Sequence, residues 1–457
     1  MRIAVIGAGV VGVCTAHALS KANCEVHVFE QGSAAAQGAS FAHGANYGER
    51  CAEPFFAPNF LKHCLWAVLG KPKTLHWQLK NSINDYGLLL KAALCARQSR
   101  HAQTQQDLLD LARYNAVLAP HFVGSEPLEF EQSVGLMVLH TQAPALEAAA
   151  AALKHPAMGN AQANKKATVA TLLTPADAYV QQAALAQTPA LLAASVYPSH
   201  EFGNCALFTK QRNLRHQQQG VHYWFNAQVS RLEQRLEQRL EHEQPPWRVF
   251  THKPSQAMAA PREDVTDTQD TPDSIKHATQ LDFDAVIVAA GAGSTALLAQ
   301  IGLHFPVLNT HAYTVTLPLH DPIEAPKTSV LHEASGTYMT PIGNRIRLSG
   351  QHQLGAMTKP ASRAYQALNA CLHQWFPYAS KMTQASYDCS SSSVAIDSKP
   401  IVGQTRLPGL WVNFAHGAAP FASSFACAQA LADQLTNPAQ AYNLNPFSPA
   451  RFSKHSI

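Results

Sequence analysis

Residues 3–30 read IAVIGAGVVGVCTAHALSKANCEVHVFE, and this stretch decides the fold. Residues 3–6 form an apolar run that is typical of a buried parallel strand. The pattern G-x-G-x-x-G follows at once, and we expect a helix over residues 10–19 and a second strand over residues 25–29. A strand, a glycine turn, a helix and a strand in this order predict a βαβ unit that binds a dinucleotide.

Each glycine of the pattern has a separate physical role. Gly7 permits the tight turn, Gly9 lets the backbone approach a pyrophosphate, and Gly12 lets the helix pack against the strand. The N-terminus of the helix offers free N–H groups and the positive end of a dipole to phosphates. Glu30 stands at the end of the second strand, where its carboxylate can accept hydrogen bonds from a ribose diol.

The composition argues against several classes of protein. The 457 residues carry a formal net charge of +4, which gives no reason to expect nucleic-acid binding. No apolar run of about 18 residues occurs, and the first residues are typical of a strand rather than of a signal peptide. The nine cysteines form no C-x-x-C pair, which favours reduced thiols in the cytoplasm. The 23 histidines show no clustered spacing, so we expect no metal site.

Hydrophobic periodicity predicts the organisation of the remaining chain. Residues 60–120 show mostly helical spacing, whereas residues 305–355 alternate with period two and predict strands. The run Asp284-Ala-Val-Ile-Val predicts a buried strand that returns to the nucleotide-binding sheet. We therefore expect an α/β protein in which an α+β domain, built on a mostly antiparallel sheet, is inserted into a Rossmann-like domain. The expected ranges are 1–85, 170–300 and 385–445 for the Rossmann-like domain, and 86–169 and 301–384 for the inserted domain.

A repeated stretch interrupts this pattern. Leu232, Leu236 and Leu240 recur at helical spacing within repeats of Arg-Leu-Glu, and they predict a helix over residues 231–242. Such a helix would be either a slipped repeat on a solvated surface or a helix that binds a partner. Because residues 252–280 are polar and lack periodicity, we expect residues 231–281 as a whole to form a flexible insertion.

Several further segments, taken in order, resemble a known family. They are Ser40-Phe-Ala-His-Gly, Ala52-Glu-Pro-Phe, Cys205-Ala-Leu-Phe-Thr, Val288-Ala-Ala-Gly-Ala, Pro400-Ile-Val-Gly and Asn413-Phe-Ala-His-Gly. Together with the opening stretch they resemble the FAD-dependent amine oxidoreductases of the D-amino acid oxidase superfamily. The resemblance runs over nearly the whole chain and is greatest to the bacterial D-amino acid dehydrogenase branch, small subunit.

The resemblance implies that the dinucleotide is FAD. It places the pyrophosphate at the glycine turn, the adenosine ribose at Glu30, the adenine beside Val229 and the flavin ring beside Ser40 and Phe41. It also places the N-terminus of the last helix near the negative charge of a reduced flavin. The implied FAD-binding residues are Gly7, Gly9, Val10, Val11, Gly12, Glu30, Gln31, Ser40, Phe41, Ala42, Val229, Ala290, Gly291, Gly403, His416 and Gly417.

The chemistry implied is hydride transfer from the substrate Cα–H to flavin N5, followed by hydrolysis of the imino acid to a 2-oxo acid and ammonia. A carboxylate needs a cationic partner, and Arg345 and Arg347 share one face of an expected strand. Tyr313 and Tyr338 are candidates to cover the pocket or to hold the carboxylate. The electrons would pass to a respiratory acceptor, and the protein would be cytoplasmic with peripheral contact at the inner face of the cell membrane.

The chain departs from the family pattern beside the expected flavin. Ser392 and Ser393 stand where the family usually has Arg and Pro, and Pro420 replaces a usual Gly. The loss of a positive charge there would weaken the hold on an anionic substrate or raise the cost of flavin reduction. Two other functions therefore stay open: an amine oxidase for a substrate that is not an amino acid, and a flavin-binding paralogue that serves as a non-catalytic subunit.

Overall fold

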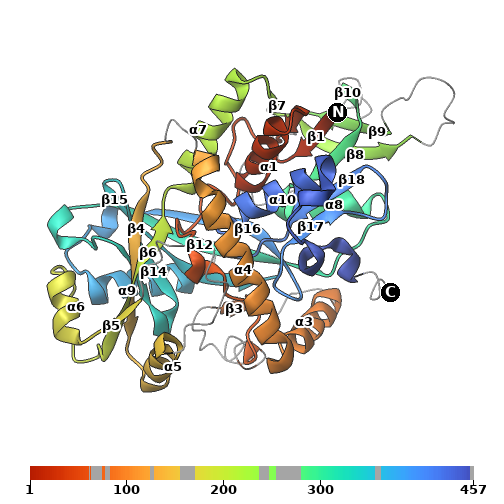
Figure 1. Ribbon diagram of the computed structural model, residues 1–457. Helices are drawn as coiled ribbons and strands as arrows, with labels where there is room; N and C mark the ends of the chain where they lie inside the picture. Colours follow the sequence, from red (N-terminus) through yellow and green to blue (C-terminus); the bar gives the residue numbers. More distant parts are fainter. Residues whose placement is uncertain are drawn as a thin grey trace, which may run out of the picture.

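A six-stranded sheet forms the core of the nucleotide-binding part in the computed structural model (Figure 1). The structure describes residues 1–60, 62, 75–77, 83–123, 128–154, 170–235, 246–253, 279–355 and 362–452. The strand order is β17 (Ile401–Gln404), β18 (Leu410–Phe414), β11 (Ala285–Val288), β1 (Arg2–Ile6), β2 (Glu25–Phe29) and β7 (His222–Trp224). All neighbouring pairs are parallel except β17 with β18. The expected βαβ unit and the return of the strand after Asp284 are confirmed.

Helices cover one face of this sheet, and a second sheet covers the other. The helices are α1 (Val10–Lys21), α4 (Gln98–Val123), α7 (Cys205–Gln218) and α10 (Ser424–Thr436), which share one apolar core. On the opposite face lie α8 (Ser294–Ala299) and a three-stranded sheet of β8 (Gln228–Gln234), β9 (Trp247–His252) and β10 (Thr279–Phe283). This is the layered packing of a dinucleotide-binding domain.

The helix expected over residues 231–242 is wrong where the structure describes it. Residues up to Gln234 belong to β8, in which Leu232 is buried while Arg231 and Glu233 point outward. The spacing of the leucines fits a helix, but pairing with β9 and burial under the six-stranded sheet select a strand. The expected flexible insertion therefore contains β8, β9 and β10, and its residues 236–245 and 254–278 lie outside the described residues.

A nine-stranded, mostly antiparallel sheet forms the second part of the molecule, at the lower left of Figure 1. Helix α9 (Ser362–Trp375) packs on one of its faces. The strand order is β16 (Ser386–Ala395), β12 (Val307–Pro318), β15 (Arg345–Leu354), β14 (Thr337–Ile342), β13 (Ser329–His332), β4 (Ser133–His140), β6 (Ala193–Phe202) and β5 (Thr171–Leu173), and β3 (Leu75–Trp77) pairs with β15. The remaining helices are α3 (Ile83–Cys95), α5 (Ala143–Lys154) and α6 (Pro175–Gln181).

The expected fold class is confirmed, but the sheets divide the chain differently from the expected domain ranges. Strands β5 and β6 pair within the nine-stranded sheet, although residues 170–300 were assigned to the Rossmann-like domain. Helix α4 packs against α10 of the nucleotide-binding part, although residues 86–169 were assigned to the inserted domain. In Figure 1, α4 runs from the neighbourhood of α3 to that of α1 and α10. Helix α4 meets α10 across about 310 positions, and β6 joins the sheet through β4, so neither difference follows from local patterns.

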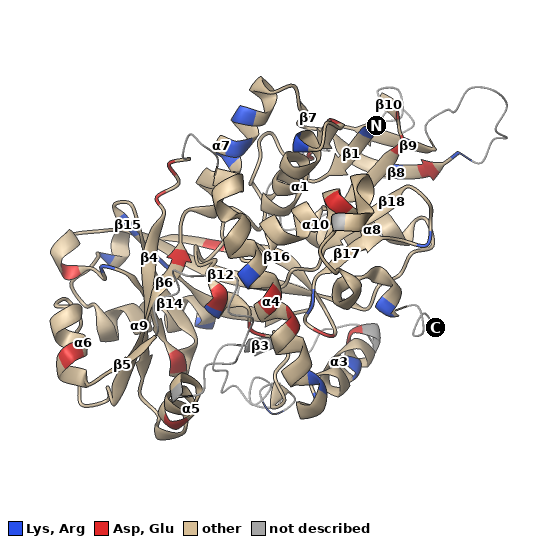
Figure 2. Ribbon diagram, in the orientation of Figure 1, with Lys and Arg blue, Asp and Glu red and all other residues tan. Residues whose placement is uncertain are grey.

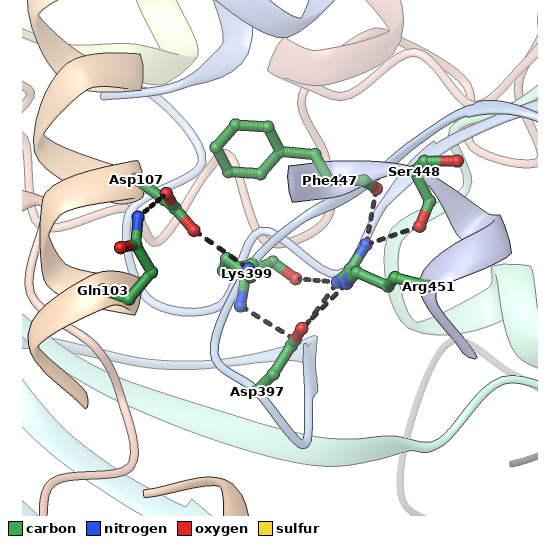
Figure 3. A network of polar contacts seen from close by, with 7 residues as sticks. All are labelled: Gln103, Asp107, Asp397, Lys399, Phe447, Ser448 and Arg451. Atoms are coloured by element: carbon green, nitrogen blue, oxygen red, sulfur yellow. Dashed lines mark hydrogen bonds and ion pairs between the residues drawn. The ribbon is translucent and has the colours of Figure 1, made fainter. Parts of the chain in front are cut away.

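A polar network joins α4, the turn before β17 and the last described residues (Figure 3). Arg451 forms a bidentate ion pair with Asp397, at 2.8 and 3.1 Å, and donates a hydrogen bond to the Lys399 carbonyl. The Lys399 ammonium reaches Asp107 of α4 at 3.0 Å. All four side chains are largely buried, so the network fixes the turn at residues 397–399 to both neighbours.

Charged side chains are sparse over the ribbon, and both signs are present along α4 (Figure 2). This fits the low share of charged residues, 14%, in the sequence. In the part of the chain that the structure describes, no helix combines the length and the apolar character that crossing a membrane requires.

Candidate functional site

The glycine turn after β1 is too crowded for any side chain at two of its three positions. Gly7 has φ +107°, and a Cβ there would lie 2.6 Å from the carbonyl oxygen of Ala289. A Cβ on Gly12 would lie 1.9 Å from the carbonyl oxygen of Gly7. The structural roles expected for both glycines, a tight turn and close packing of helix on strand, are thus confirmed.

The N-terminus of α1 presents backbone donors toward the loop that begins at Ser40. Gly9 caps the helix without a side-chain hydrogen bond, and a Cβ there would lie only 3.2 Å from Ser40 Oγ. Ser40 Oγ accepts a hydrogen bond from the Val10 amide at 2.9 Å. The amides of Val11 and Gly12 belong to the first turn, where no helical carbonyl can accept from them. These donors fit an anion of the size of a pyrophosphate group.

Glu30 lies at the mouth of the same turn. Its carboxylate accepts hydrogen bonds from the amides of Ala8 and Gly32, both at 2.8 Å, and so faces the glycine turn. Its carbonyl accepts from the Ala227 amide at 2.9 Å, which brings the start of β8, and with it Val229, to this side. Gln31 follows as an exposed residue. The residues expected to bind the adenosine half of FAD are therefore close together.

The second glycine turn lies against the first. Ala290 follows β11, and its Cα would be 3.0 Å from a Cβ on Gly7. Gly291 has φ +57° and open space where a side chain would stand. Crowding on one side and open space on the other fit a dinucleotide that crosses this edge of the sheet.

Arg347 holds the loop that starts at Ser40 against the nine-stranded sheet. It donates hydrogen bonds to the carbonyls of Phe41, at 3.1 Å, and His43, at 3.0 Å, and to Thr316 Oγ1 at 3.1 Å. The side chain is buried, and burial lowers the pKa of its guanidinium. Ala42 is buried between the two clasped carbonyls, while Phe41 is 43% exposed. The geometry gives Arg347 a structural role in place of the expected contact with substrate.

Arg345 is also engaged. Its guanidinium lies 2.9 Å from both carboxylate oxygens of Glu131. The two arginines share one face of β15, as expected, but protein groups occupy both of them. A cation that holds a carboxylate would therefore have to come from another element.

The two candidate tyrosines point to different places. Tyr313 is fully buried, and its hydroxyl donates to Gln353 Oε1 at 2.6 Å, beneath Tyr365 of α9. It belongs to the core between α9 and the sheet, on the face away from the Ser40 loop, so its expected place over the pocket is wrong. Tyr338 of β14 lies on the other face, where its neighbours include Arg50.

Sequence reasoning missed Arg50. Its guanidinium stacks on the ring of Tyr197 at 4.8 Å and lies 3.8 Å from Glu53 Oε1. Burial acts to lower the pKa of Arg50, but the nearby Glu53, Tyr197 and Tyr338 outweigh it and raise the pKa overall. Nothing in the sequence pattern marks this residue, because its partners come from distant strands.

His43 is a second residue that sequence reasoning left out of the site. Its Nδ1 accepts from the Ala45 amide at 3.1 Å, so the neutral ring carries its proton on Nε2. Burial, together with Arg347, lowers its pKa to about 4, which keeps the ring neutral. Its buried Nε2 has no partner within the described residues, and a bound group could supply the acceptor.

His416 belongs to a buried chain of hydrogen bonds at the foot of α10. Its Nε2–H donates to Asn413 Oδ1 at 2.9 Å, and its Nδ1 accepts from Ser423 at 2.8 Å. The Asn413 amide donates in turn to Thr15 of α1 at 3.0 Å. Burial lowers the pKa of His416 to about 3, so the ring is neutral and fixes the loop between β18 and α10.

The serine run that departs from the family pattern forms part of β16. Ser392 Oγ is 2.7 Å from Thr310 Oγ1 of β12, and Ser391 Oγ is 2.9 Å from His311 Nδ1. The Ser393 carbonyl accepts from the Gly417 amide at 3.0 Å, which ties the strand to the His416 loop. The hydroxyls of Ser391 and Ser392 therefore form hydrogen bonds with the neighbouring strand β12, and they do not replace the missing arginine.

Gly403 lies apart from the other expected FAD-binding residues. It pairs with Val412 within the sheet at φ +129°, and a Cβ there would face Pro449 and Gln434. Its immediate neighbours thus come from the C-terminal half of α10 and the end of the chain rather than from the His416 loop.

A cavity separates the Arg50 segment from the His416 loop. It holds about 70 Å³ of solvent space. Its lining includes Cys51, Ala52 and Glu53, three residues of α4, and His416 and Gly417. The cavity therefore joins the segment after the Ser40 loop to the residues expected at the flavin ring.

Two histidines that are distant in the sequence come together in space. His27 of β2 stacks on His222 of β7, with Glu25 2.9 Å from His27 Nε2. Trp224 Nε1 donates to His27 Nδ1 at 3.2 Å, and Arg2 Nε lies 3.0 Å from Glu25. A metal at His27 Nε2 would require the proton to move to Nδ1, where Trp224 already donates. These contacts give the cluster a structural role.

The comparisons with known proteins agree with this geometry. Among curated relatives, a D-amino acid dehydrogenase of Neisseria meningitidis serogroup C (strain 053442) is 25% identical over 437 residues, 95% of each chain. A D-amino acid dehydrogenase of Cereibacter sphaeroides (strain ATCC 17023) is 27% identical over 446 residues, 95% of this chain and 92% of that one.

Among solved structures, glycine oxidase from Geobacillus kaustophilus superimposes with a TM-score of 0.67 at 17% identity, over 98% of both chains. The profile of the DAO family, described as FAD dependent oxidoreductase, matches residues 2–434. The chain therefore belongs to the DAO family of FAD-dependent oxidoreductases.

Proposed function

We propose that this protein oxidises the α-carbon of a D-amino acid to an imino acid, which water hydrolyses to a 2-oxo acid and ammonia. The observation that carries the proposal is the nearly full-length similarity to curated D-amino acid dehydrogenases, at 25% and 27% identity. FAD, when bound, supplies the acceptor for the hydride.

The chain's own residues would hold FAD in two groups. The backbone donors at the start of α1 would bind the pyrophosphate, and Glu30 would bind the adenosine ribose. The loop from Ser40 to His43, clasped by Arg347, and the His416–Gly417 turn would hold the flavin half. Buried hydrogen bonds hold the backbone of the second group in place, from Arg347 to the Ser40 loop and from His416 to Asn413.

The electrons would pass to a respiratory acceptor at the inner face of the cell membrane, with the protein in peripheral contact. A dehydrogenase of this kind transfers electrons to a quinone-like dye and reacts slowly with oxygen. The ratio of the two rates, measured with dichlorophenolindophenol and with an oxygen electrode, tests this part of the proposal.

A second candidate is an amine oxidase for a substrate without a carboxylate. It is favoured by the lack of a free cation among the residues expected to bind a carboxylate. Ser392 replaces the usual arginine, Arg345 is paired with Glu131, and Arg347 donates to backbone carbonyls. Such an enzyme would have no need of a free cation at its pocket.

The deciding experiment is the anaerobic visible spectrum of the purified holoprotein, recorded before and after the addition of D-amino acids, L-amino acids and simple amines. Dithionite, added at the end, shows how much of the flavin is reducible. Bleaching by D-amino acids alone supports the proposal. Bleaching by amines alone supports the second candidate, and a flavin that only dithionite bleaches contradicts both.

A further inference from the structure

Arg50 stands out among the cations of the interface between the two sheets. It lies in a short 3-10 turn, η1 (Glu49–Cys51), that follows the clasped Ser40 loop. Its side chain is 36% exposed, whereas Arg347 on the same side of the nine-stranded sheet is 5% exposed. The Arg50 guanidinium is therefore accessible to a ligand, whereas the Arg347 guanidinium is not.

The contacts of Arg50 hold it in place without using its hydrogen bonds. The Arg50 guanidinium lies over the Tyr197 ring, 4.8 Å from the ring centroid, in a cation–π contact that uses no hydrogen bond. Glu53 is 3.8 Å away, too far for a hydrogen bond. Arg50 Nε is buried and has no acceptor among the described residues. By contrast, Arg345 and Arg347 donate to a carboxylate and to carbonyls.

Tyr338 provides a second group at the same place. It comes from β14, and its electrostatic neighbours are Arg50, Cys51 and Glu53. A guanidinium and a tyrosine hydroxyl that influence one another electrostatically can both donate hydrogen bonds to a carboxylate. Tyr197 supports the Arg50 guanidinium through the cation–π contact.

The position of Arg50 relates this donor set to the reaction. Cys51 and Glu53, one and three residues further along the chain, line a cavity that His416 and Gly417 also line. His416 and Gly417 belong to the turn at which the proposed function places the flavin ring. An anion held by Arg50 would thus stand at the edge of the space in which the reacting carbon must lie.

We propose that Arg50 binds the carboxylate of the substrate, with Tyr338 as a second donor. Arg50 would thus supply the positive charge that is lost where Ser392 replaces the usual arginine. The assignment rests on the proposed function. It narrows the substrate class to amines that carry a carboxylate next to the reacting carbon, and it opposes the second candidate.

The test compares the holoproteins of Arg50→Met and Arg50→Lys with wild type. Benzoate serves as a carboxylate that cannot be oxidised, and its dissociation constant is read from the change in the flavin spectrum. We expect Arg50→Met to weaken benzoate binding about 10- to 100-fold, the loss of a charged hydrogen-bonded contact, with Arg50→Lys between the two. The KM for a D-amino acid should rise by a similar factor, with a smaller change in kcat.

Arg113→Met is the matched control. Arg113 belongs to α4, is 27% exposed and lies 3.7 Å from Glu49 of the same turn as Arg50. It should leave the benzoate constant within about twofold of wild type. Ethylamine, which has no carboxylate, gives a further control, because any slow reaction with it should not depend on Arg50. Circular dichroism of each variant shows that the fold is kept.

Two outcomes separate this inference from the proposed function. If D-amino acids bleach the wild-type flavin but Arg50→Met keeps the wild-type KM and benzoate constant, the assignment of Arg50 is wrong and the proposed function stands. If no amino acid bleaches the wild-type flavin while benzoate binding still depends on Arg50, the proposed function fails and the carboxylate site stands.

Discussion

Asn115 Oδ1 of α4 lies 2.8 Å from the backbone nitrogen of Phe425, in the first turn of α10. The same oxygen accepts from the Ala426 amide at 3.1 Å, and Asn115 Nδ2 donates to the Phe421 carbonyl. Ser423, at the cap position, makes no capping bond with its own side chain. A residue some 310 positions away therefore caps the helix whose N-terminus the resemblance places near the flavin.

Replacement of Asn115 by Ala should destabilise the protein. The variant leaves two buried N–H groups without an acceptor, so we expect the free energy of unfolding to fall by about 1–3 kcal/mol. Urea unfolding followed by circular dichroism measures the change. Asn115→Asp keeps the acceptor and should retain most of the stability, and exposed Asn309→Ala should change little. Equal losses in Asn115→Asp and Asn115→Ala would refute the capping role.

Arg347 and Arg345 offer a matched pair for the clasp on the Ser40 loop. Arg347→Met removes the donors to the carbonyls of Phe41 and His43, so the loop should loosen and the dissociation constant for FAD should rise about 10-fold or more. Arg345→Met breaks only the ion pair with Glu131 and should leave FAD binding unchanged. Titration of the apoproteins by quenching of flavin fluorescence measures both constants. An equal effect in the two variants would contradict the clasp.

Two glycines of the first turn, Gly9 and Gly12, should respond differently to alanine. Gly12→Ala places Cβ 1.9 Å from a backbone oxygen, so we expect a loss of more than about 3 kcal/mol and little folded protein. Gly9→Ala meets only Ser40 Oγ at 3.2 Å, so it should fold but bind FAD more weakly. Gly38→Ala, with no atom within 4 Å of its Cβ, is the control. Yield, melting temperature and flavin content distinguish them, and a stable Gly12→Ala would show that the packing is wrong.

Buried histidines should make the protein sensitive to acid. Burial lowers the pKa of His416 and that of His200 to about 3, against 6.5 in the unfolded chain. As pH falls below about 6.5, the unfolded state takes up protons that the folded state does not, so stability is full above this pH and is lost toward pH 3. Each such histidine contributes up to ~1.4 kcal/mol per pH unit to the slope.

The measurement is the free energy of urea unfolding at several pH values between 7 and 5. His416→Asn should reduce the slope by about one proton, whereas exposed His373→Asn should not. The slope, rather than the stability itself, is the readout, because His416→Asn also disturbs hydrogen bonds. An unchanged slope in His416→Asn would mean that this ring is charged in the folded protein.

The elements predicted best from the sequence are those whose cause is local. The strand and helix ranges at residues 3–6, 10–19 and 25–29 agree with β1, α1 and β2 to within two residues, because the apolar runs and glycines specify them directly. The resemblance, carried by short motifs, supplied the family.

What could not be predicted depends on contacts between distant residues. Arg347 shares one strand face with Arg345, and this spacing favours a role in binding a substrate carboxylate. Its hydrogen-bond acceptors, however, are 306 and 304 positions away in the sequence. The residues of β12 alternate between the two faces of the sheet. Only the position of α9 decides that the face with Tyr313 is the buried one. Arg50 belongs to no recognisable motif. Its surroundings are formed by Tyr197 of β6 and Tyr338 of β14, which are distant in the sequence.

The strand order of the six-stranded sheet has a consequence for the order of events on the ribosome. β1 lies between β2, which is made almost at once, and β11, which is made some 280 residues later. β18, which pairs with β11, and α10, which packs against α1, emerge later still. The first βαβ unit therefore waits, with one edge and one helix face uncovered, until most of the chain has been synthesised. FAD would then be captured by the finished protein rather than by the growing chain, and the supply of free cofactor would set how much of the completed polypeptide becomes holoenzyme.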